Sequence, residues 1–141
     1  RIIRAFAAIP IGRFLDIHKG HLDEYYTLVV SGFLVGFTYI ALFFSSDLWH
    51  VYVGMSLIAL GHALDVSAWR ILFYGNLPED ARGQVIGVYE TTMQIVYALA
   101  IVVAGFVGEV FGFEWTLFFA GIITISSAMI ILVIRGSRER L

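Results

Sequence analysis

The sequence predicts an all-α protein, a polytopic bundle of about five transmembrane helices. Three observations favour this fold class. Of the 141 residues, 60% are hydrophobic and 14% are charged, whereas a soluble domain is about 45–50% apolar and about 25% charged. The hydrophobic residues form continuous runs, and four runs reach the roughly 20 residues that a spanning helix needs. All nine Lys and Arg residues lie near one edge of these runs or inside them.

Each run is expected to form one helix. In the lipid core, backbone groups must pair within helices or closed barrels, and barrel strands would alternate apolar and polar residues over about ten positions. The runs are continuous and too long for barrel strands, so they predict helices. The four long runs, the second to fifth segments, are about Tyr25–Ser46, Trp49–Tyr74, Gly83–Phe111 and Trp115–Ile134.

The first segment, Ile2–Leu15, is short and begins almost at the first residue. We expect residues 1–15 to form the cytoplasmic half of a helix that is truncated at its start. The alternative is an amphipathic helix lying on the membrane surface, which Arg1 and Arg4 would suit.

The basic residues predict the orientation of the bundle, because cytoplasmic loops are enriched in Lys and Arg. Segments 13–24 and 75–82 and the tail from Arg135 hold most of them, whereas 47–50 and 111–114 hold none. We therefore expect an integral membrane protein of the cell membrane, inner or plasma, with a cytoplasmic C-terminus.

Several classes of protein are excluded by composition. No cleavable signal-peptide pattern is present, and the absence of Cys removes disulfides, thiolate metal sites and thiol catalysis. A net charge of −2 is too close to neutral to indicate a nucleic-acid partner. No cofactor or metal site is predicted, and no G-x-x-x-x-G-K-[ST] loop is available to bind a nucleotide.

Small residues recur at the spacing that lets membrane helices approach closely. Gly32 and Gly36 form a G-x-x-x-G in the second segment. Small residues also repeat every four positions along the fourth segment and just past its end, at Ala100, Ala104, Gly108 and Gly112. This spacing predicts tight packing of helices and indicates no particular function.

Charged or titratable side chains within the spans occur in the first, third and fourth segments. They are Arg1, Arg4, His62, Asp65, Arg70, Glu90 and Glu109. A charge in hydrocarbon costs about 2.5–3.5 kcal/mol even on lenient insertion scales, so such residues normally face a bundle interior or a water-filled cavity. We therefore expect these three segments to line a polar space, and the second and fifth to support the bundle or face lipid.

Helical spacing groups several polar residues. His62, Asp65 and Trp69 fall on one face of the third segment. Asp65 lies about nine residues, or roughly 13 Å, from the cytoplasmic end of its helix. Arg4 would lie at a similar depth in a true helix. The alternative to a functional role for Asp65 is a structural ion pair with Arg4.

Glu90, Gln94 and Tyr97 share a face of the fourth segment. Together the two faces are expected to form a substrate-binding or proton-coupling cluster near the midplane, because a carboxylate in a low-dielectric cavity can carry a proton. For Glu90, too, a structural ion pair with Arg4 is the alternative. Glu109, near the far edge, is expected to be solvated.

Residues 12–20, G-R-F-L-D-I-H-K-G, resemble the loop signature of the major facilitator superfamily, roughly G-x-L-x-D-R-x-G-R-[RK]. Gly12 and Asp16 match at the right spacing. The Leu is displaced by one position, and Ile17 and Lys19 stand where Arg and Gly are usual.

A second loop is similar to one between later helix pairs of that superfamily. Residues 77–83, continuing to Gly87, resemble the short loop followed by R-G-x-x-x-G, with Arg82 at its start. Pro78 and the acids after it suit the first turn of a helix.

The superfamily fold has two six-helix halves, each built from inverted three-helix repeats. The loop signature follows the second helix of a half, so the five segments resemble helices two to six of one half. In the first half, an Arg usually precedes a Gly of the fourth helix; that position is Leu57 here. The difference favours the C-terminal half, and the chain ends soon after its last span. Residues 1–141 would then be a partial C-terminal domain, helices eight to twelve.

The family places helices eight, ten and eleven around the central cavity, which agrees with the charged segments. The resemblance implies a secondary active transporter that moves a small solute by alternating access, as a symporter or antiporter, with proton coupling open. Its partners would be the solute, protons where coupled, the bilayer and the missing N-terminal half. The expected substrate-binding or proton-coupling residues are Arg4, His62, Asp65, Trp69, Glu90 and Gln94. The expected gating and loop-signature residues are Gly12, Asp16, Arg70 and Arg82.

Two alternatives stay open. One is a non-transporting receptor or scaffold of the same fold. The other is an intramembrane enzyme with His62 and Asp65 as metal ligands or an acid–base pair. One His and one carboxylate do not complete a metal site, and no G-x-S-x-G motif is present, so we expect a protein that is not an enzyme.

Overall fold

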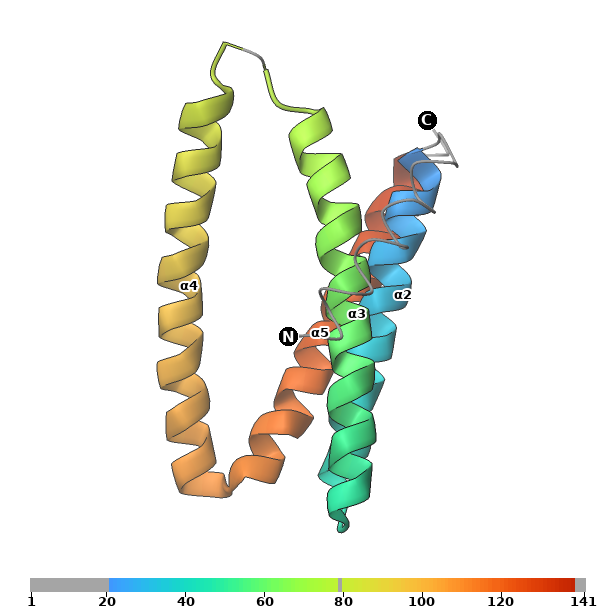
Figure 1. The fold of residues 1–141 in the computed structure, drawn as a ribbon, viewed down its shortest axis with the longest axis vertical. Coiled ribbons are helices and arrows are strands. Elements are labelled where there is room, and N and C mark those ends of the chain that lie inside the picture. Colours follow the sequence, from blue (N-terminus) through green and yellow to red (C-terminus); the bar gives the residue numbers. More distant parts are fainter. Residues whose placement is uncertain (1–20, 79, 139–141) are drawn as a thin grey trace.

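The computed structural model describes residues 21–78 and 80–138, which form four α-helices and no strand. The helices are α2 (His21–Phe43), α3 (Leu48–Gly75), α4 (Arg82–Phe111) and α5 (Phe113–Arg138) (Figure 1). Each overlaps one of the four long apolar runs, and each is long and apolar enough to cross a membrane. The predicted all-α membrane bundle is confirmed for this part of the chain. The first segment lies outside the described residues.

The turns explain where the helices end. α2 ends at Phe43, earlier than expected, because the N–H groups of Phe44 and Ser45 donate to the carbonyls of Ala41 and Leu42 at 3.2 and 3.1 Å. These i to i−3 bonds tighten the last turn and satisfy carbonyls that the helix leaves open.

Between α4 and α5 a single residue, Gly112, turns the chain with φ 98°. That conformation is open to glycine and costly for other residues. The Gly112 N–H donates to the Gly108 carbonyl at 3.1 Å, which closes the end of α4. The result is a tight hairpin of two spanning helices.

α2 is the central helix of the described part, with α3 and α5 packed against it. Glycines allow the close approach: a Cβ added at Gly36 would lie 3.0 Å from the Gly121 carbonyl oxygen, and one at Gly32 would lie 2.8 Å from the Ala128 Cβ. The tight packing predicted for Gly32 and Gly36 is confirmed, and its partner is α5.

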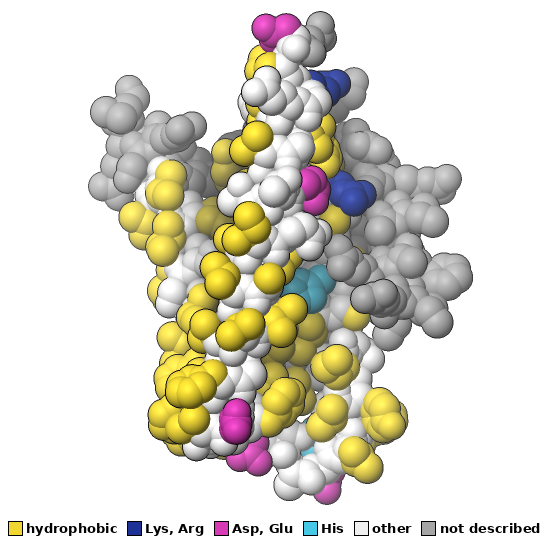
Figure 2. All heavy atoms as spheres, turned by 90° about the vertical axis from the view of Figure 1, so that its left-hand side faces the viewer, with side chains coloured by type: hydrophobic (Ala, Val, Ile, Leu, Met, Phe, Trp, Pro, Cys, Tyr) yellow, Lys and Arg dark blue, Asp and Glu magenta, His cyan; other side chains and the backbone are white. Residues whose placement is uncertain are grey.

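α4 stands apart from α3 over most of its length (Figure 1). It meets α5 near their shared turn, and none of its residues is buried. Its outward face is largely hydrophobic along its middle (Figure 2). The close packing that the spacing of small residues predicted for α4 is present only near this turn: a Cβ added at Gly108 would lie 3.3 Å from the Thr116 Oγ1 of α5, whereas Ala100 is exposed.

Candidate functional site

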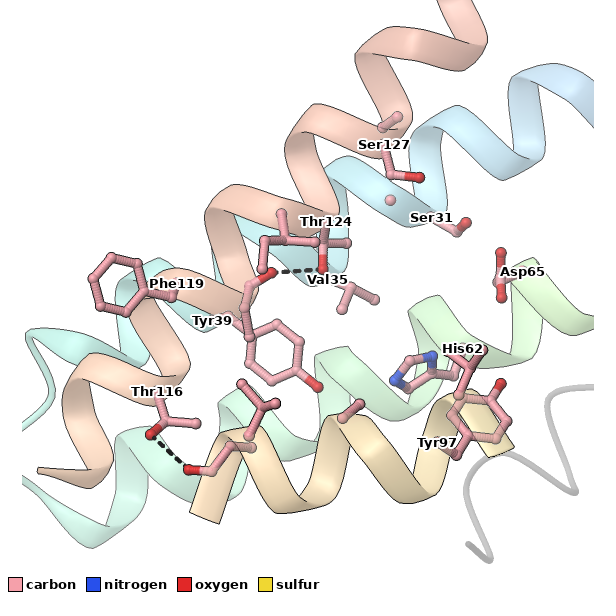
Figure 3. A pocket seen from close by; sticks show the side chains of 18 of the residues that line it. Ser31, Val35, Tyr39, His62, Asp65, Tyr97, Thr116, Phe119, Thr124 and Ser127 are labelled. Atoms are coloured by element: carbon pink, nitrogen blue, oxygen red, sulfur yellow. Dashed lines mark hydrogen bonds between the residues drawn. The ribbon is translucent and has the colours of Figure 1, made fainter. Parts of the chain in front are cut away.

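A cavity of about 880 Å³ lies between the four described helices, and all four contribute to its lining. This volume is within the range of about 300–1,000 Å³ that is usual for sites of small molecules. Most of the lining is aliphatic. The polar residues that line it are Ser31, Tyr39, His62, Asp65, Tyr97, Thr116, Thr124 and Ser127 (Figure 3).

α3 contributes the histidine and the carboxylate of the lining, His62 and Asp65. Glycine and alanine positions on another face of α3, among them Gly61 and Ala68, are buried, and Gly61 lies against Val35 of α2. Packing that face on α2 turns His62 and Asp65 towards the cavity, as their i, i+3 spacing predicted. His62 is exposed and Asp65 is half-buried.

Trp69, the third member of the predicted face, does not line the cavity. Its ring stacks on Phe73 at a centroid distance of 5.7 Å and an interplanar angle of 12°, and it also contacts Tyr89 of α4 at 6.1 Å. Phe73 and Tyr89 lie closer still, with centroids 4.5 Å apart. The three rings form an aromatic cluster that joins α3 to α4 near their loop.

The predicted face of α4 enters the cavity only in part. Tyr97 lines it, whereas Glu90 and Gln94 are exposed and outside the lining. The lining of α4 begins at Val96, so Glu90 lies roughly 9 Å nearer the loop at 1.5 Å per residue. The structure therefore does not bring Glu90 and Gln94 together with His62 and Asp65 around this cavity.

Hydroxyl groups on α2 and α5 belong to the lining, although these helices were expected to support the bundle or face lipid. The Ser31 Oγ donates to the Leu28 carbonyl at 2.8 Å, and the Thr124 Oγ1 donates to the Ala120 carbonyl at 2.8 Å. Each hydroxyl donates its proton within its own helix. The Thr124 side chain is half-buried, whereas Ser31 is almost fully buried. Sequence reasoning missed them because Ser and Thr are common in membrane helices. The i, i+3 spacing of Thr124 and Ser127 on an apolar helix was the available signal.

Other predicted residues lie away from the cavity or outside the described part. Arg4, Gly12 and Asp16 precede the described residues. Arg70 and Arg82 are exposed, and the Arg82 Nη2 donates to the Tyr74 carbonyl at 3.3 Å, which ties the loop to the end of α3. Among the described residues, no group of three or more His, Cys, Asp and Glu could hold a metal ion.

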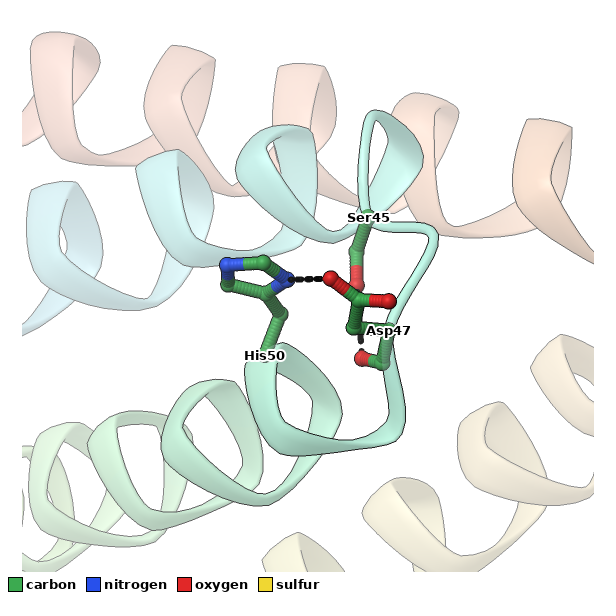
Figure 4. A network of polar contacts seen from close by, with 3 residues as sticks. All are labelled: Ser45, Asp47 and His50. Atoms are coloured by element: carbon green, nitrogen blue, oxygen red, sulfur yellow. Dashed lines mark hydrogen bonds and ion pairs between the residues drawn. The ribbon is translucent and has the colours of Figure 1, made fainter.

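A small polar network marks the turn between α2 and α3. The His50 Nδ1 lies 3.6 Å from the Asp47 Oδ2, and the Ser45 Oγ donates to the Asp47 carbonyl at 3.4 Å (Figure 4). Both side chains are largely exposed, so their contact contributes little stability. It belongs to the turn and not to the cavity.

The family model described as Major Facilitator Superfamily matches residues 2–140, which include all of the described part. No curated protein and no solved structure matches the chain. The match agrees with the resemblance of the two loops and with the four spanning helices.

Proposed function

The chain belongs to the Major Facilitator Superfamily, a family of membrane transporters, and we propose that it is part of a secondary transporter that moves a small solute by alternating access. The observation that carries the proposal is the position of His62 and Asp65 side by side on the cavity wall of α3. The protein would lie in the cell membrane with its C-terminus in the cytoplasm.

His62 and Asp65 are the residues proposed to bind solute or proton. Ionisable groups within a membrane span are costly, so those that persist usually serve a pathway or a binding site. A carboxylate accepts hydrogen bonds or takes up a proton, and an imidazole both donates and accepts. Tyr97 and Ser127 line the same cavity (Figure 3) and are exposed, so they would help to orient a polar solute.

The remaining predicted residues take other proposed roles. Trp69 would hold α3 and α4 together at their loop end. Arg70 and Arg82, near that loop, would act with Asp16 in gating. Glu90 and Gln94 would contact the solute only where the path continues beyond the cavity towards the loop. In this proposal residues 1–141 are helices eight to twelve of the C-terminal half, and the N-terminal half completes the path.

The test uses the full-length protein reconstituted in proteoliposomes that contain the pH dye pyranine. A panel of radiolabelled amino acids, sugars, organic anions and organic cations is screened for uptake and for coupled proton flux. Asp65→Asn and His62→Gln are expected to lower the initial uptake rate about tenfold or more, since bonds to charged groups contribute about 1.5–3 kcal/mol and about 1.4 kcal/mol is a factor of ten.

The matched control is Glu109→Gln, which removes an exposed carboxylate near the opposite end of α4 and should leave uptake within about twofold, since surface substitutions rarely exceed 0.5 kcal/mol. The uptake rate of Glu90→Gln is expected to lie between that of the control and those of the two site variants. Normal uptake by Asp65→Asn and His62→Gln would refute the proposed site. Absence of uptake for every solute, with stable solute binding, would favour a receptor. Metal-dependent turnover would favour an enzyme.

A further inference from the structure

Glu24 is a buried acidic residue that does not belong to the candidate site. α2 begins at His21, before the predicted run Tyr25–Ser46, so Glu24 is part of the helix and not of the preceding loop. The residue is only 6% exposed, and its Oε2 atom has no hydrogen-bond partner among the described residues. An ionised carboxylate that is buried without a partner is so costly that such a group usually takes up a proton. The burial of Glu24 therefore favours a role in binding a proton.

Helical spacing places Glu24 in line with the cavity. Glu24, Leu28 and Ser31 follow one another at i, i+4 and i+7, so they share a face of α2. Leu28 and Ser31 line the cavity, whereas Glu24 does not. Glu24 thus lies one turn beyond the end of the α2 lining at Leu28, roughly 6 Å at 1.5 Å per residue, on the side of the α3–α4 loop.

A small apolar contact separates Glu24 from the cavity. Leu28 packs with Ala68 and Leu72 of α3 in one buried cluster, in which Ala68 is 0% exposed. Asp65 precedes Ala68 by three residues, shares its face of α3 and lines the cavity. Asp65 and Glu24 therefore lie on opposite sides of this contact, the first on the cavity side and the second on the loop side.

The register of the two helices gives the separation of the two acids. α2 and α3 run antiparallel, with Leu28 against Ala68. In this register Asp65, three residues before Ala68, lies level with Ser31, three residues after Leu28. Glu24 is seven residues from Ser31, or roughly 10 Å along the axis. This is longer than a hydrogen bond of about 2.5–3.0 Å between oxygens, so a proton passes between the acids only through water.

The helices around Glu24 disfavour a permanent negative charge there. The same register places Glu24 level with Leu72, in the last turn of α3, which ends at Gly75. That turn carries the negative end of the helix dipole and contains no basic residue. α5, the other helix packed on α2, has no titratable side chain over residues 115–134. Uptake of a proton by Glu24 removes the unfavourable charge.

The remaining titratable groups of this region belong to α2 itself and to α3. Those described are Tyr25 and Tyr26 on α2, and His62, Asp65, Arg70 and Tyr74 on α3. Arg70 and Tyr74 lie two residues before and after Leu72, so they fall on the side of α3 opposite the contact with α2. Asp65 is the one carboxylate among these groups and is the natural partner of Glu24 in proton exchange.

We propose that Glu24 is a second proton-carrying residue, which exchanges a proton with Asp65 through water when the contact of Leu28 with Ala68 and Leu72 loosens. The proposal deepens the proposed function and rests on it, because Asp65 is the cavity acid that takes up the proton. Glu24 then passes the proton to the cytoplasmic side. While the contact is closed, it keeps water from joining the two acids.

The exchange is a simple proton transfer. The O–H bond of the Asp65 carboxylic acid breaks, a proton moves along the water chain, and an O–H bond forms at the Glu24 Oε2. Asp65 is left as a carboxylate and Glu24 as a neutral acid. The step needs no oxidant, reductant or further reactant.

The first experiment needs no transport. Infrared difference spectra of the full-length protein in lipid vesicles are recorded as the buffer is changed from alkaline to acidic. A carboxylic acid without a hydrogen bond absorbs at the high-frequency end of the C=O range, so protonated Glu24 is expected to give a band there. Glu24→Gln should remove the band. The matched control is Asp80→Asn, which removes an exposed acid of the α3–α4 loop and should leave the band unchanged.

The second experiment uses proteoliposomes that contain pyranine, with a solute that the protein transports. Glu24→Gln should lower solute-driven proton flux about a hundredfold, since a positioned proton-transfer group contributes about 10²–10⁴-fold. Exchange of labelled for unlabelled solute should stay within about twofold, because exchange needs solute binding and no net release of protons. Asp80→Asn should retain both activities. If Glu24→Gln accumulates poorly, Glu24→Asp replaces it, and the infrared band should shift in frequency.

Two results would overturn the proposal. Infrared difference spectra that are unchanged in Glu24→Gln would mean that Glu24 exchanges no proton, whatever the protein transports. Equal losses of solute exchange and proton flux would assign Glu24 a structural role. If no solute is transported, the proposed function fails, and the infrared band still decides whether Glu24 binds a proton.

Discussion

α2 and α4 are both long, apolar helices, yet 39% of the apolar window of α2 is buried and 0% of that of α4. Both carry small residues four positions apart. Gly32 and Gly36 of α2 meet α5 at backbone distance, whereas Ala100 and Ala104 of α4 face the cavity. Lipid tails are as apolar as leucine, so hydrophobicity does not drive helices together in a membrane. The comparison teaches that small-residue spacing marks a surface suited to a helix, and that burial follows only where the partner helix is present.

The largest effect is expected for a substitution in the packed contact between α2 and α5. In Gly36→Leu, the new side chain must displace the Gly121 backbone or Ile125, because a Cβ alone would lie 3.0 and 2.6 Å from their atoms. Such overpacking costs about 1–3 kcal/mol and sometimes more. We expect a clear fall in the thermal unfolding temperature of the purified full-length protein.

Gly105→Leu in α4 is the matched control, because nothing lies within 4 Å of a Cβ at Gly105. It should be neutral or slightly stabilising, since leucine forms helix better than glycine by somewhat less than about 1 kcal/mol. Equal destabilisation by both variants would mean that α4 is packed as tightly as α2 in the full-length protein, on a face that does not line the cavity.

The fold was predictable because run length alone distinguishes a spanning helix from other elements. Apolar runs such as Trp49–Tyr74 needed no tertiary contact to be assigned, and α3 (Leu48–Gly75) coincides with that run closely. The helix partners were not predictable in the same way. Gly32 and Gly36 indicated a close contact, but the identity of α5 as their partner depends on the crossing of the two helices in space.

The candidate site shows the same division. The i, i+3 spacing of His62 and Asp65 predicted a shared face, and both line the cavity. Glu90 shares a face with Tyr97, yet only Tyr97 lines it. Helical spacing gives the angular position of a residue around the helix axis. It does not give the level along that axis at which two neighbouring helices move apart. For α3 and α4 that level is determined by the aromatic cluster that joins them. It cannot be predicted from the sequence of either helix alone.

An intermediate effect is expected for the contact that links α3 to α4. Phe73→Leu keeps an apolar side chain and removes the ring that contacts both Trp69 and Tyr89. Aromatic pairs contribute about 0.5–1.5 kcal/mol beyond their buried area. We expect a loss of about 1 kcal/mol in the stability of the full-length protein, together with faster hydrogen exchange at the loop end of α4.

Phe106→Leu controls for the loss of a ring, because Phe106 is 63% exposed on α4 and lies outside the aromatic cluster. It should leave both readouts near their original values. If Phe73→Leu and Phe106→Leu behaved alike, the loop ends of α3 and α4 would be held by other contacts, and the separation of α4 from the packed helices would need another explanation.

The smallest effect is expected at the turn between α2 and α3, where a polar network is visible but weakly coupled to the fold. Asp47 precedes α3, yet its side chain makes no capping hydrogen bond, so the roughly 1 kcal/mol typical of an N-cap is not available. Its pair with His50 is 3.6 Å long, and the two side chains are 72% and 62% exposed. Asp47→Ala and the isosteric Asp47→Asn should each change stability by less than about 0.5 kcal/mol in thermal or chemical unfolding.

A loss above about 1 kcal/mol in Asp47→Ala alone would mean that this turn fixes the angle between α2 and α3. The close packing of α2 would then depend on its connection as well as on its glycines.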